Sequence, residues 1–134
     1  MKFTVRPGKE SDCAEILSLI KELAVFEKAA DEVDIDEEIL KNDGFGENPI
    51  YDLFVAEFKD KIVGMALFYE KYSTWKGRSI YLEDLIVTEK LRGNGIGKAL
   101  FNAVAEEAKK RNSGRMEWQV SDWNQSAIDF YKSA

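Results

Sequence analysis

The chain has 134 residues, a formal net charge of −6, no histidine and one cysteine. Its acidic balance disfavours nucleic acid as a partner, because phosphates would be repelled over most of the surface. The missing histidines exclude Ser–His–Asp and Cys–His catalysis and the common zinc sites, so we expect no metal and assign any proton transfer to Glu, Asp, Lys or Tyr.

The rest of the composition is typical of a single globular domain, residues 1–134. Apolar residues make up 45% of the chain and charged residues 33%, which excludes the disordered and fibrous classes. No apolar run approaches the ~20 residues needed to cross a bilayer, and the N-terminus shows no signal peptide. The lone Cys13 excludes an internal disulfide framework and suits a reducing compartment, so we expect a cytoplasmic protein without membrane attachment.

A strand and a long helix are predicted at the start of the chain. Residues 2–7 alternate between apolar and polar side chains, as a half-buried strand does. Residues 11–30 follow a helical period, and Asp12 and Glu15 have the spacing of a capping box. The apolar stripe expected on this helix consists of Ile16, Leu17, Ile20, Leu23 and Ala24.

A short acidic helix and three strands are predicted next. Residues 34–43 favour a helix that ends at Gly44. Two β-rich runs within residues 51–73 flank a charged turn at 60–61, which indicates a hairpin. Residues 78–90 contain a third run, whose apolar residues lie on both faces toward its end, as in a central strand.

The last part of the chain predicts a helix, a strand and a final short helix. These lie at residues 98–112, 114–121 and 124–134. With the first half, they indicate a mixed α/β domain whose helices cover one sheet. The buried stripe expected on the first of the two helices consists of Leu100, Phe101, Val104 and Ala108.

Three glycines occupy five positions at the front of that helix, in the stretch LRGNGIGKAL. Glycine starts a helix poorly, but it lets the backbone approach a ligand with its N–H groups exposed. The helix N-terminus behind the glycines adds a partial positive charge. A strand, a glycine turn and a helix in this order therefore predict a cradle for a phosphate group.

Two common nucleotide motifs do not fit this stretch. A dinucleotide fingerprint would need glycine at Lys98 or Leu100, and a P-loop would need glycine at Arg92 and Ser or Thr at Ala99. The pattern that remains is R-x-x-G-x-G.

This pattern resembles the acetyl-coenzyme A pyrophosphate loop of the GNAT superfamily of N-acetyltransferases. The segments YLEDLIV, RGNGIG, DGFGENP, IKELAVFE and WNQSAIDFYK are similar to those of the diamine (spermidine/spermine) N-acetyltransferases and their thialysine-acetylating relatives. The resemblance implies an α/β (α+β) fold with a mixed, mostly antiparallel sheet flanked by helices. It also implies acetyl-CoA as co-substrate and a homodimer. The family continues through a final strand pair that this chain, which stops at Ala134, is expected to lack.

The resemblance also assigns the cofactor contacts. Backbone amides of the glycine loop should hold the pyrophosphate, with Arg92 framing the loop. The end of the preceding strand should pair with the pantetheine arm as an added strand would, and the amide near Leu85 should be an oxyanion donor. The residues expected to bind acetyl-CoA are Leu85, Ile86, Val87, Arg92, Gly93, Asn94, Gly95, Ile96, Gly97, Lys98, Asn124 and Ser126.

Two residues are expected to be catalytic. By resemblance, Tyr131 is the acid that protonates the coenzyme A thiolate, since its ordinary pKa of ~10 is near that of a thiol. It shares a helical face with Ala127 and Ile128, so packing alone would also explain it. Glu83 is the expected base, acting through water. It neighbours Asp84 in a strand, so in a regular sheet the two point to opposite faces and only one meets the substrate.

Carboxylates and aromatic rings should surround a cationic amine. Trp75 would equally suit a surface loop, and Glu27 a solvated helix end. Phe26 stands where the family tends to have tyrosine, which removes a hydroxyl. The residues that the resemblance places near the amine are Phe26, Glu27, Trp75, Glu83, Glu117, Trp118 and Gln119.

Three functions follow as hypotheses. The first is acetylation of a small polyamine or diamine. The second is acetylation of thialysine, lysine or another amino-acid amine, which acidic pocket residues alone do not separate from the first. The third, from a different class, is acetyl-CoA binding without turnover, and the presence of both Glu83 and Tyr131 argues against it.

Overall fold

The computed structural model describes residues 1–119. A five-stranded sheet runs in the order β1-β2-β3-β4-β5, antiparallel except for the parallel pair β4–β5. This confirms the predicted mixed, mostly antiparallel sheet and the order of elements up to the last strand. In chain order, the elements are β1 (Thr4–Pro7), α1 (Cys13–Phe26), α2 (Glu37–Phe45), β2 (Asp52–Phe58), β3 (Lys61–Ser73), β4 (Gly77–Val87), α3 (Ile96–Lys110) and β5 (Arg115–Trp118).

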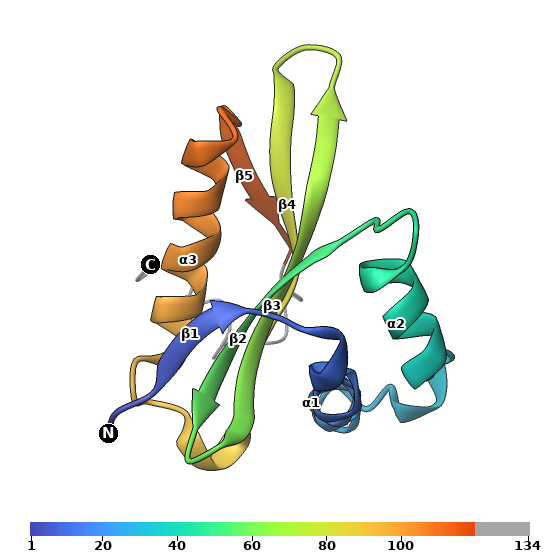
Figure 1. The fold of residues 1–134 in the computed structure, drawn as a ribbon, viewed down its shortest axis with the longest axis vertical. Helices are drawn as coiled ribbons and strands as arrows, with labels where there is room; N and C mark the ends of the chain where they lie inside the picture. The colour runs from blue at the N-terminus through green and yellow to red at the C-terminus, as the bar shows by residue number, and fades with distance from the viewer. Residues whose placement is uncertain (120–134) are drawn as a thin grey trace.

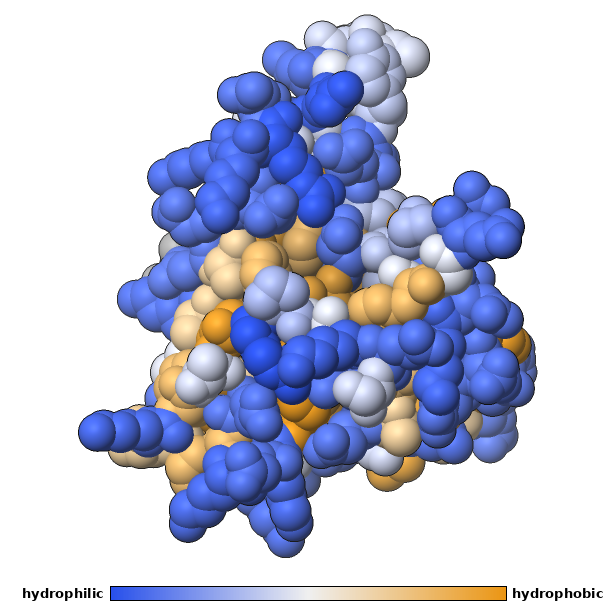
Figure 2. Space-filling view, in the orientation of Figure 1, coloured by the Kyte–Doolittle hydropathy of each residue, from blue (hydrophilic) through white to orange (hydrophobic). Residues whose placement is uncertain are grey.

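Helices cover both faces of the sheet. In Figure 1, α3 lies along one side of the strands and α1 and α2 lie on the other, while the β3–β4 hairpin projects beyond the helices. Figure 2 shows apolar side chains gathered in the middle of this view, between α3 and α2, with hydrophilic side chains on the outer faces of the helices. The sheet is therefore the middle layer of three.

Each face has its own hydrophobic core. All four residues of the predicted α3 stripe are buried, and they pack on residues such as Phe68 and Leu82. On the other face, Ile16 and Leu40 meet Met65 and Ile86. Burying one such large side chain stabilises the fold by roughly 1.5–3 kcal/mol. On α1, Ile16 and Ala24 are buried as predicted, and Leu17, Ile20 and Leu23 are partly buried and pack against the core. The predicted stripe omits Leu19, which is also buried.

The predicted capping box at the start of α1 is wrong. The carboxylate of Asp12 instead accepts hydrogen bonds from Arg6, at 2.9 and 3.1 Å, and from the amide of Lys9 at 2.8 Å. Burial raises the pKa of Asp12, but these hydrogen bonds outweigh it and hold the pKa below the ordinary value. Glu15 accepts from the amide of Ile62 at 2.9 Å. Both carboxylates bind tertiary partners that local spacing does not reveal.

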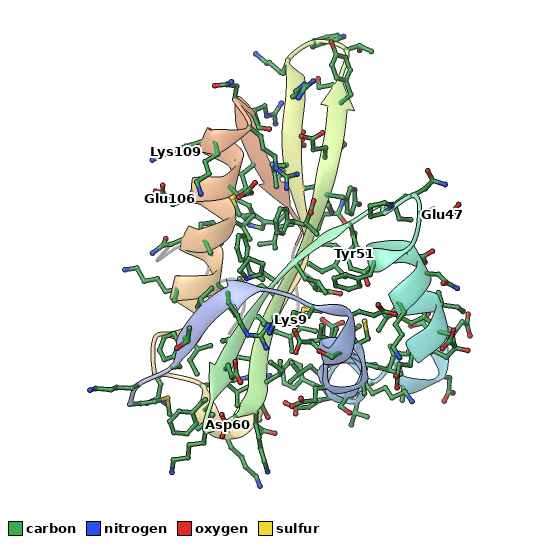
Figure 3. All side chains as sticks on the ribbon, viewed as in Figure 1. Lys9, Glu47, Tyr51, Asp60, Glu106 and Lys109 are labelled. Atoms are coloured by element: carbon green, nitrogen blue, oxygen red, sulfur yellow. The ribbon has the colours of Figure 1, made fainter. Side chains whose placement is uncertain are left out.

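Several predicted boundaries shift: α1 ends at Phe26, four residues before its predicted end, and two others move by one residue. Helix α2 continues through Gly44 to Phe45, and a side chain at Gly44 would collide with the ring of Tyr51. That ring lies between α2 and the sheet (Figure 3). The first hairpin turns at Lys59 and Asp60, one residue earlier than predicted, and both have positive φ angles, as the twist of a tight hairpin favours.

Candidate active site

The glycine loop is open on its outer side. Gly93 and Gly95 have φ angles of 84° and 83°, and no atom lies within 4 Å of the position a Cβ would take at either residue. Gly95 is the N-cap of α3 and provides no side-chain cap. The first N–H groups of the helix thus face the loop, with room for an anion beside them. These features fit the pyrophosphate of acetyl-CoA.

Two side chains of the loop bind its own main chain. The Nε of Arg92 donates to the carbonyl of Val87 at 3.3 Å, and the amide of Asn94 donates to the carbonyl of Leu91 at 3.0 Å. Arg92 also lies over the ring of Phe26, with 5.3 Å between its guanidinium carbon and the ring centroid. Arg92, expected at the cofactor, and Phe26, expected near the amine, therefore lie in contact with each other.

Glu22 ties α1 to the same loop, although sequence analysis did not identify it. Its carboxylate accepts from the hydroxyl of Thr88 at 3.0 Å and from the amide of Glu89 at 2.9 Å. The single turn at Glu89–Leu91 is thereby capped from another element. No sequence signal reveals this contact, because the partners are 66 and 67 residues apart.

The start of α3 sits closely on the sheet. A Cβ at Gly64 would lie 3.1 Å from the carbonyl oxygen of Ile86 and 3.2 Å from the side chain of Ile96. Both of these isoleucines are buried, so only their main chains can serve a ligand. Because position 64 carries no side chain, the first turn of α3 can pack directly against β3. Lys98 is exposed on the first turn of the helix.

Strand β4 loses its partner β5 at Glu83. Strand β5 pairs with β4 from Ser79 opposite Arg115 to Leu82 opposite Trp118. In the described part of the chain, residues 83–87 have no strand on that side, and this stretch ends beside the glycine loop. An extended ligand arm could add to this edge in the way that the sequence analysis expects.

A β-bulge brings two carboxylates to one face. Leu67 pairs with Asp84 and Phe68 with Leu82, so Glu83 is an extra residue in β4. The hydroxyl of Tyr69 donates to Glu83 at 3.1 Å, and Asp84 lies opposite Leu67, which packs in the α1-side core. The expectation for a regular sheet, that Glu83 and Asp84 point to opposite faces, is therefore wrong here.

The bulge changes the acidity of Asp84. Burial raises its pKa to about 7, and the nearby charges of Glu83 and Glu27 add to the shift. A carboxyl group with such a pKa exchanges a proton near neutral pH, which suits a general base. Sequence analysis did not assign Asp84 a role; a buried carboxylate beside another in a strand is the signal that could have identified it.

A row of polar and aromatic side chains continues from Glu83 across the sheet. Tyr69, Tyr81 and Glu117 lie opposite one another on three neighbouring strands, and the two tyrosine rings are 5.5 Å apart. Burial raises the pKa of Tyr81, and Glu83, Glu117 and Asp84 raise it further. Tyr81 thus lies within the field of carboxylates on both sides.

Other predicted amine contacts lie elsewhere. Trp75 is 91% exposed at the tip of the β3–β4 hairpin, roughly 25 Å along the strand from Glu83 at ~3.3 Å per residue. Trp118 packs edge-to-face on Phe101 at 5.2 Å, on the α3 side of the sheet. Gln119 is exposed just after β5. Tyr131, Asn124 and Ser126 lie outside the described residues.

Residues 1–119 lack two kinds of feature. They contain no helix long and apolar enough to span a bilayer. They also contain no group of three His, Cys, Asp or Glu side chains placed to hold a metal ion.

Comparisons with known proteins point in one direction. Residues 13–134 match the model of the "Acetyltransferase (GNAT) family". The chain is 47% identical to a thialysine N-epsilon-acetyltransferase of Bos taurus, covering 96% of this chain and 81% of the relative. It is 37% identical to the human spermidine/spermine N(1)-acetyltransferase-like protein 1, covering 98% of this chain but 20% of that protein.

Solved structures share the fold. An aminoglycoside acetyltransferase from an uncultured soil metagenomic sample, in complex with sisomicin, superposes with a TM-score of 0.81 at 23% identity, covering 98% of this chain and 86% of the other. An aminoglycoside N-acetyltransferase AAC(6')-Iy in complex with CoA gives a TM-score of 0.80 at 15% identity, with the same coverage.

Proposed function

The chain belongs to the GNAT acetyltransferase family and is an acetyl-CoA-dependent N-acetyltransferase, and we propose that it acetylates the primary amine of a small cationic substrate beside Glu83 and Asp84. The observation that carries this proposal is the pair of carboxylates next to an open strand edge, above the glycine loop. The edge would receive the thioester arm, and the carboxylates would receive the amine.

The chain's own residues have separate roles in this proposal. The open amides of the glycine loop bind the pyrophosphate, and residues 83–87 hold the extended arm. Glu83 and Asp84 attract the ammonium group and take its proton, directly or through water, because an amine attacks only when neutral. Acetyl-CoA supplies the acetyl group: the new C–N bond replaces the C–S bond, and the sulfur leaves as a thiolate. Tyr131 remains our proposed donor of the proton to that thiolate.

Two substrate classes remain candidates. The resemblance of sequence motifs favours a polyamine or diamine. Three mammalian relatives, 43–47% identical to this chain, are thialysine N-epsilon-acetyltransferases, whereas the relative named for spermidine/spermine is 37% identical. This difference supports an amino-acid amine of the thialysine kind as the substrate.

Thiol release from acetyl-CoA tests the proposal. The assay would compare spermidine, spermine, putrescine, thialysine, lysine and a lysine peptide, with Tyr131→Phe beside the parent. We expect turnover with a small amine, reduced roughly tenfold or more in the variant if the phenol is the acid. Binding of acetyl-CoA without turnover on any amine would contradict an enzymatic role and support a binding protein.

A further inference from the structure

An ionic cluster lies two to four residues along β4 from Glu83, on the same face of the sheet as the proposed amine site. It consists of Lys71, Ser79, Arg115 and Glu117. Lys71, Ser79 and Arg115 are opposite one another on β3, β4 and β5, and Glu117 lies diagonally beside them, next to Tyr81. Neither the glycine loop nor the carboxylate pair uses this cluster.

Glu117 is held in a fixed position. Its Oε2 accepts a hydrogen bond of 2.8 Å from the hydroxyl of Ser79, a residue with no exposed surface. This hydrogen bond, the largest cause, together with Lys71 and Arg115 lowers the pKa of Glu117 against the opposing effect of burial. The carboxylate therefore stays ionised and oriented at neutral pH.

Lys71 is held near Glu117 and Tyr81, but its ammonium group makes no short hydrogen bond to either. Its ammonium lies 5.3 Å from the centroid of the Tyr81 ring and 3.6 Å from Oε1 of Glu117. A strong ammonium–carboxylate hydrogen bond is about 2.7–2.9 Å long, so this pair is loose. The side chain is 50% exposed, and a pair of this kind adds little to stability. A ligand group can thus bind Lys71 without breaking a strong contact.

The balance of charge in the cluster is positive. Arg115 lies 3.8 Å from the same oxygen of Glu117, so two cations surround one carboxylate. A second ammonium group, such as a polyamine carries, would meet a net like charge here. A zwitterionic group would find both signs, with a carboxylate on the lysine side and an ammonium on the glutamate.

We propose that Lys71 and Glu117 bind the α-amino-acid end of the substrate, Lys71 contacting its carboxylate and Glu117 its α-ammonium. The substrate would then lie along Tyr69 and Tyr81 with its side-chain amine at Glu83 and Asp84. Lys71 thereby selects ω-amino acids such as thialysine and lysine over polyamines. This inference rests on the proposed acetyltransferase function and specifies its substrate class.

Lysine and cadaverine provide the direct test, because they differ only in the α-carboxylate. We would measure kcat and KM for both by thiol release, in the parent and in Lys71→Met, Lys71→Arg and Lys76→Met. The parent should prefer lysine. Lys71→Met should raise the KM for lysine roughly tenfold, with kcat little changed, and leave the KM for cadaverine the same or lower. Lys71→Arg should keep most of the preference.

Lys76→Met is the matched control. Lys76 is exposed on the same hairpin, and its loss removes the same charge without touching the cluster. It should leave both substrates unchanged. An equal effect of Lys71→Met on lysine and cadaverine, or an equal effect of the two methionine variants, would overturn the inference.

Calorimetric titration of lysine and cadaverine separates this inference from the function itself. If no amine is acetylated, the proposed function fails. Loss of lysine binding in Lys71→Met, with cadaverine binding retained, would still support the subsite. If amines are acetylated and Lys71→Met alters neither binding nor preference, the function stands and the subsite fails.

Discussion

The glycine loop and the amine side of the site contact their ligands with different parts of the chain. At the loop, Gly93 and Gly95 offer bare backbone, and the side chains of Arg92 and Asn94 are engaged with main-chain carbonyls. On the amine side, carboxylates and rings from three strands form the surface. Backbone recognition suits a co-substrate shared by a whole family, whereas side chains can change one at a time and so set the choice of amine.

This difference predicts that substitutions in one region alter acetyl-CoA binding and substitutions in the other alter the reaction of the amine. The largest effect should follow loss of both carboxylates. In Glu83→Gln/Asp84→Asn the amine keeps its proton, so we expect kcat to fall roughly 10²–10⁴-fold while the Kd for acetyl-CoA stays the same. Stopped-flow thiol release and calorimetry measure the two quantities. Glu106→Gln is a control on the outer face of α3, where the side chain points away from the sheet (Figure 3). If the double variant retained most of its activity, neither carboxylate would be the general base.

A substitution in the glycine loop should weaken acetyl-CoA binding and leave the choice of amine unchanged. Gly95→Ala places a methyl group in the open cradle, so we expect the Kd for acetyl-CoA to rise roughly 10- to 100-fold with little change in amine selectivity. Gly77→Ala is the matched control, since Gly77 has a φ of 84° and equally open space at the hairpin tip. Both variants should lose about 1–2 kcal/mol of unfolding free energy from backbone strain. Equal losses of acetyl-CoA affinity in both would contradict the cradle.

The pH dependence of the unfolding free energy should test the protonation of Asp84 independently of activity. The folded chain raises the pKa of Asp84 from 3.8 to about 7, so between these values it holds a proton that the unfolded chain releases. The contribution of Asp84 to stability is therefore greatest in acid and falls as pH rises through this window.

Replacing the carboxyl by an amide should remove that pH dependence. Asp84→Asn should exceed the parent in unfolding free energy by roughly 1–3 kcal/mol at pH 8 and by little at pH 4. Urea unfolding at the two pH values measures the difference. Asp60→Asn, at an exposed turn, is the matched control for the exchange itself. A gap for Asp84→Asn that does not change with pH would show that its carboxyl is ionised in the fold.

The smallest effect is expected at Glu22, which ties α1 to the glycine loop. Glu22→Ala removes the hydrogen bonds to Thr88 and Glu89, so the loop should become less ordered. We expect a severalfold higher KM for acetyl-CoA, corresponding to about 1 kcal/mol, and an unchanged KM for the amine. If only the KM for the amine changed, Glu22 would act on the amine side and not on the glycine loop.

The same contrast explains what sequence could predict. The order of helices and strands along the chain, the buried stripe of α3 and the phosphate cradle depend on local period and on glycine, and the structure confirms the first two. The bulge at Glu83 depends on register between distant strands, and one extra residue turned both carboxylates to one face. The partners of Asp12 and the Lys71–Glu117 pair also depend on tertiary packing, which no single segment encodes.

The pH dependence of kcat/KM for thialysine tests the central claim that amine deprotonation takes place at the Glu83–Asp84 pair. The parent should show a limb with an apparent pKa near 7 that belongs to the pair. In Asp84→Asn this limb should be lost, because the amide at position 84 does not exchange a proton in this range. Superimposable profiles in the two proteins, at equal rates, would contradict the assignment of these carboxylates as the base.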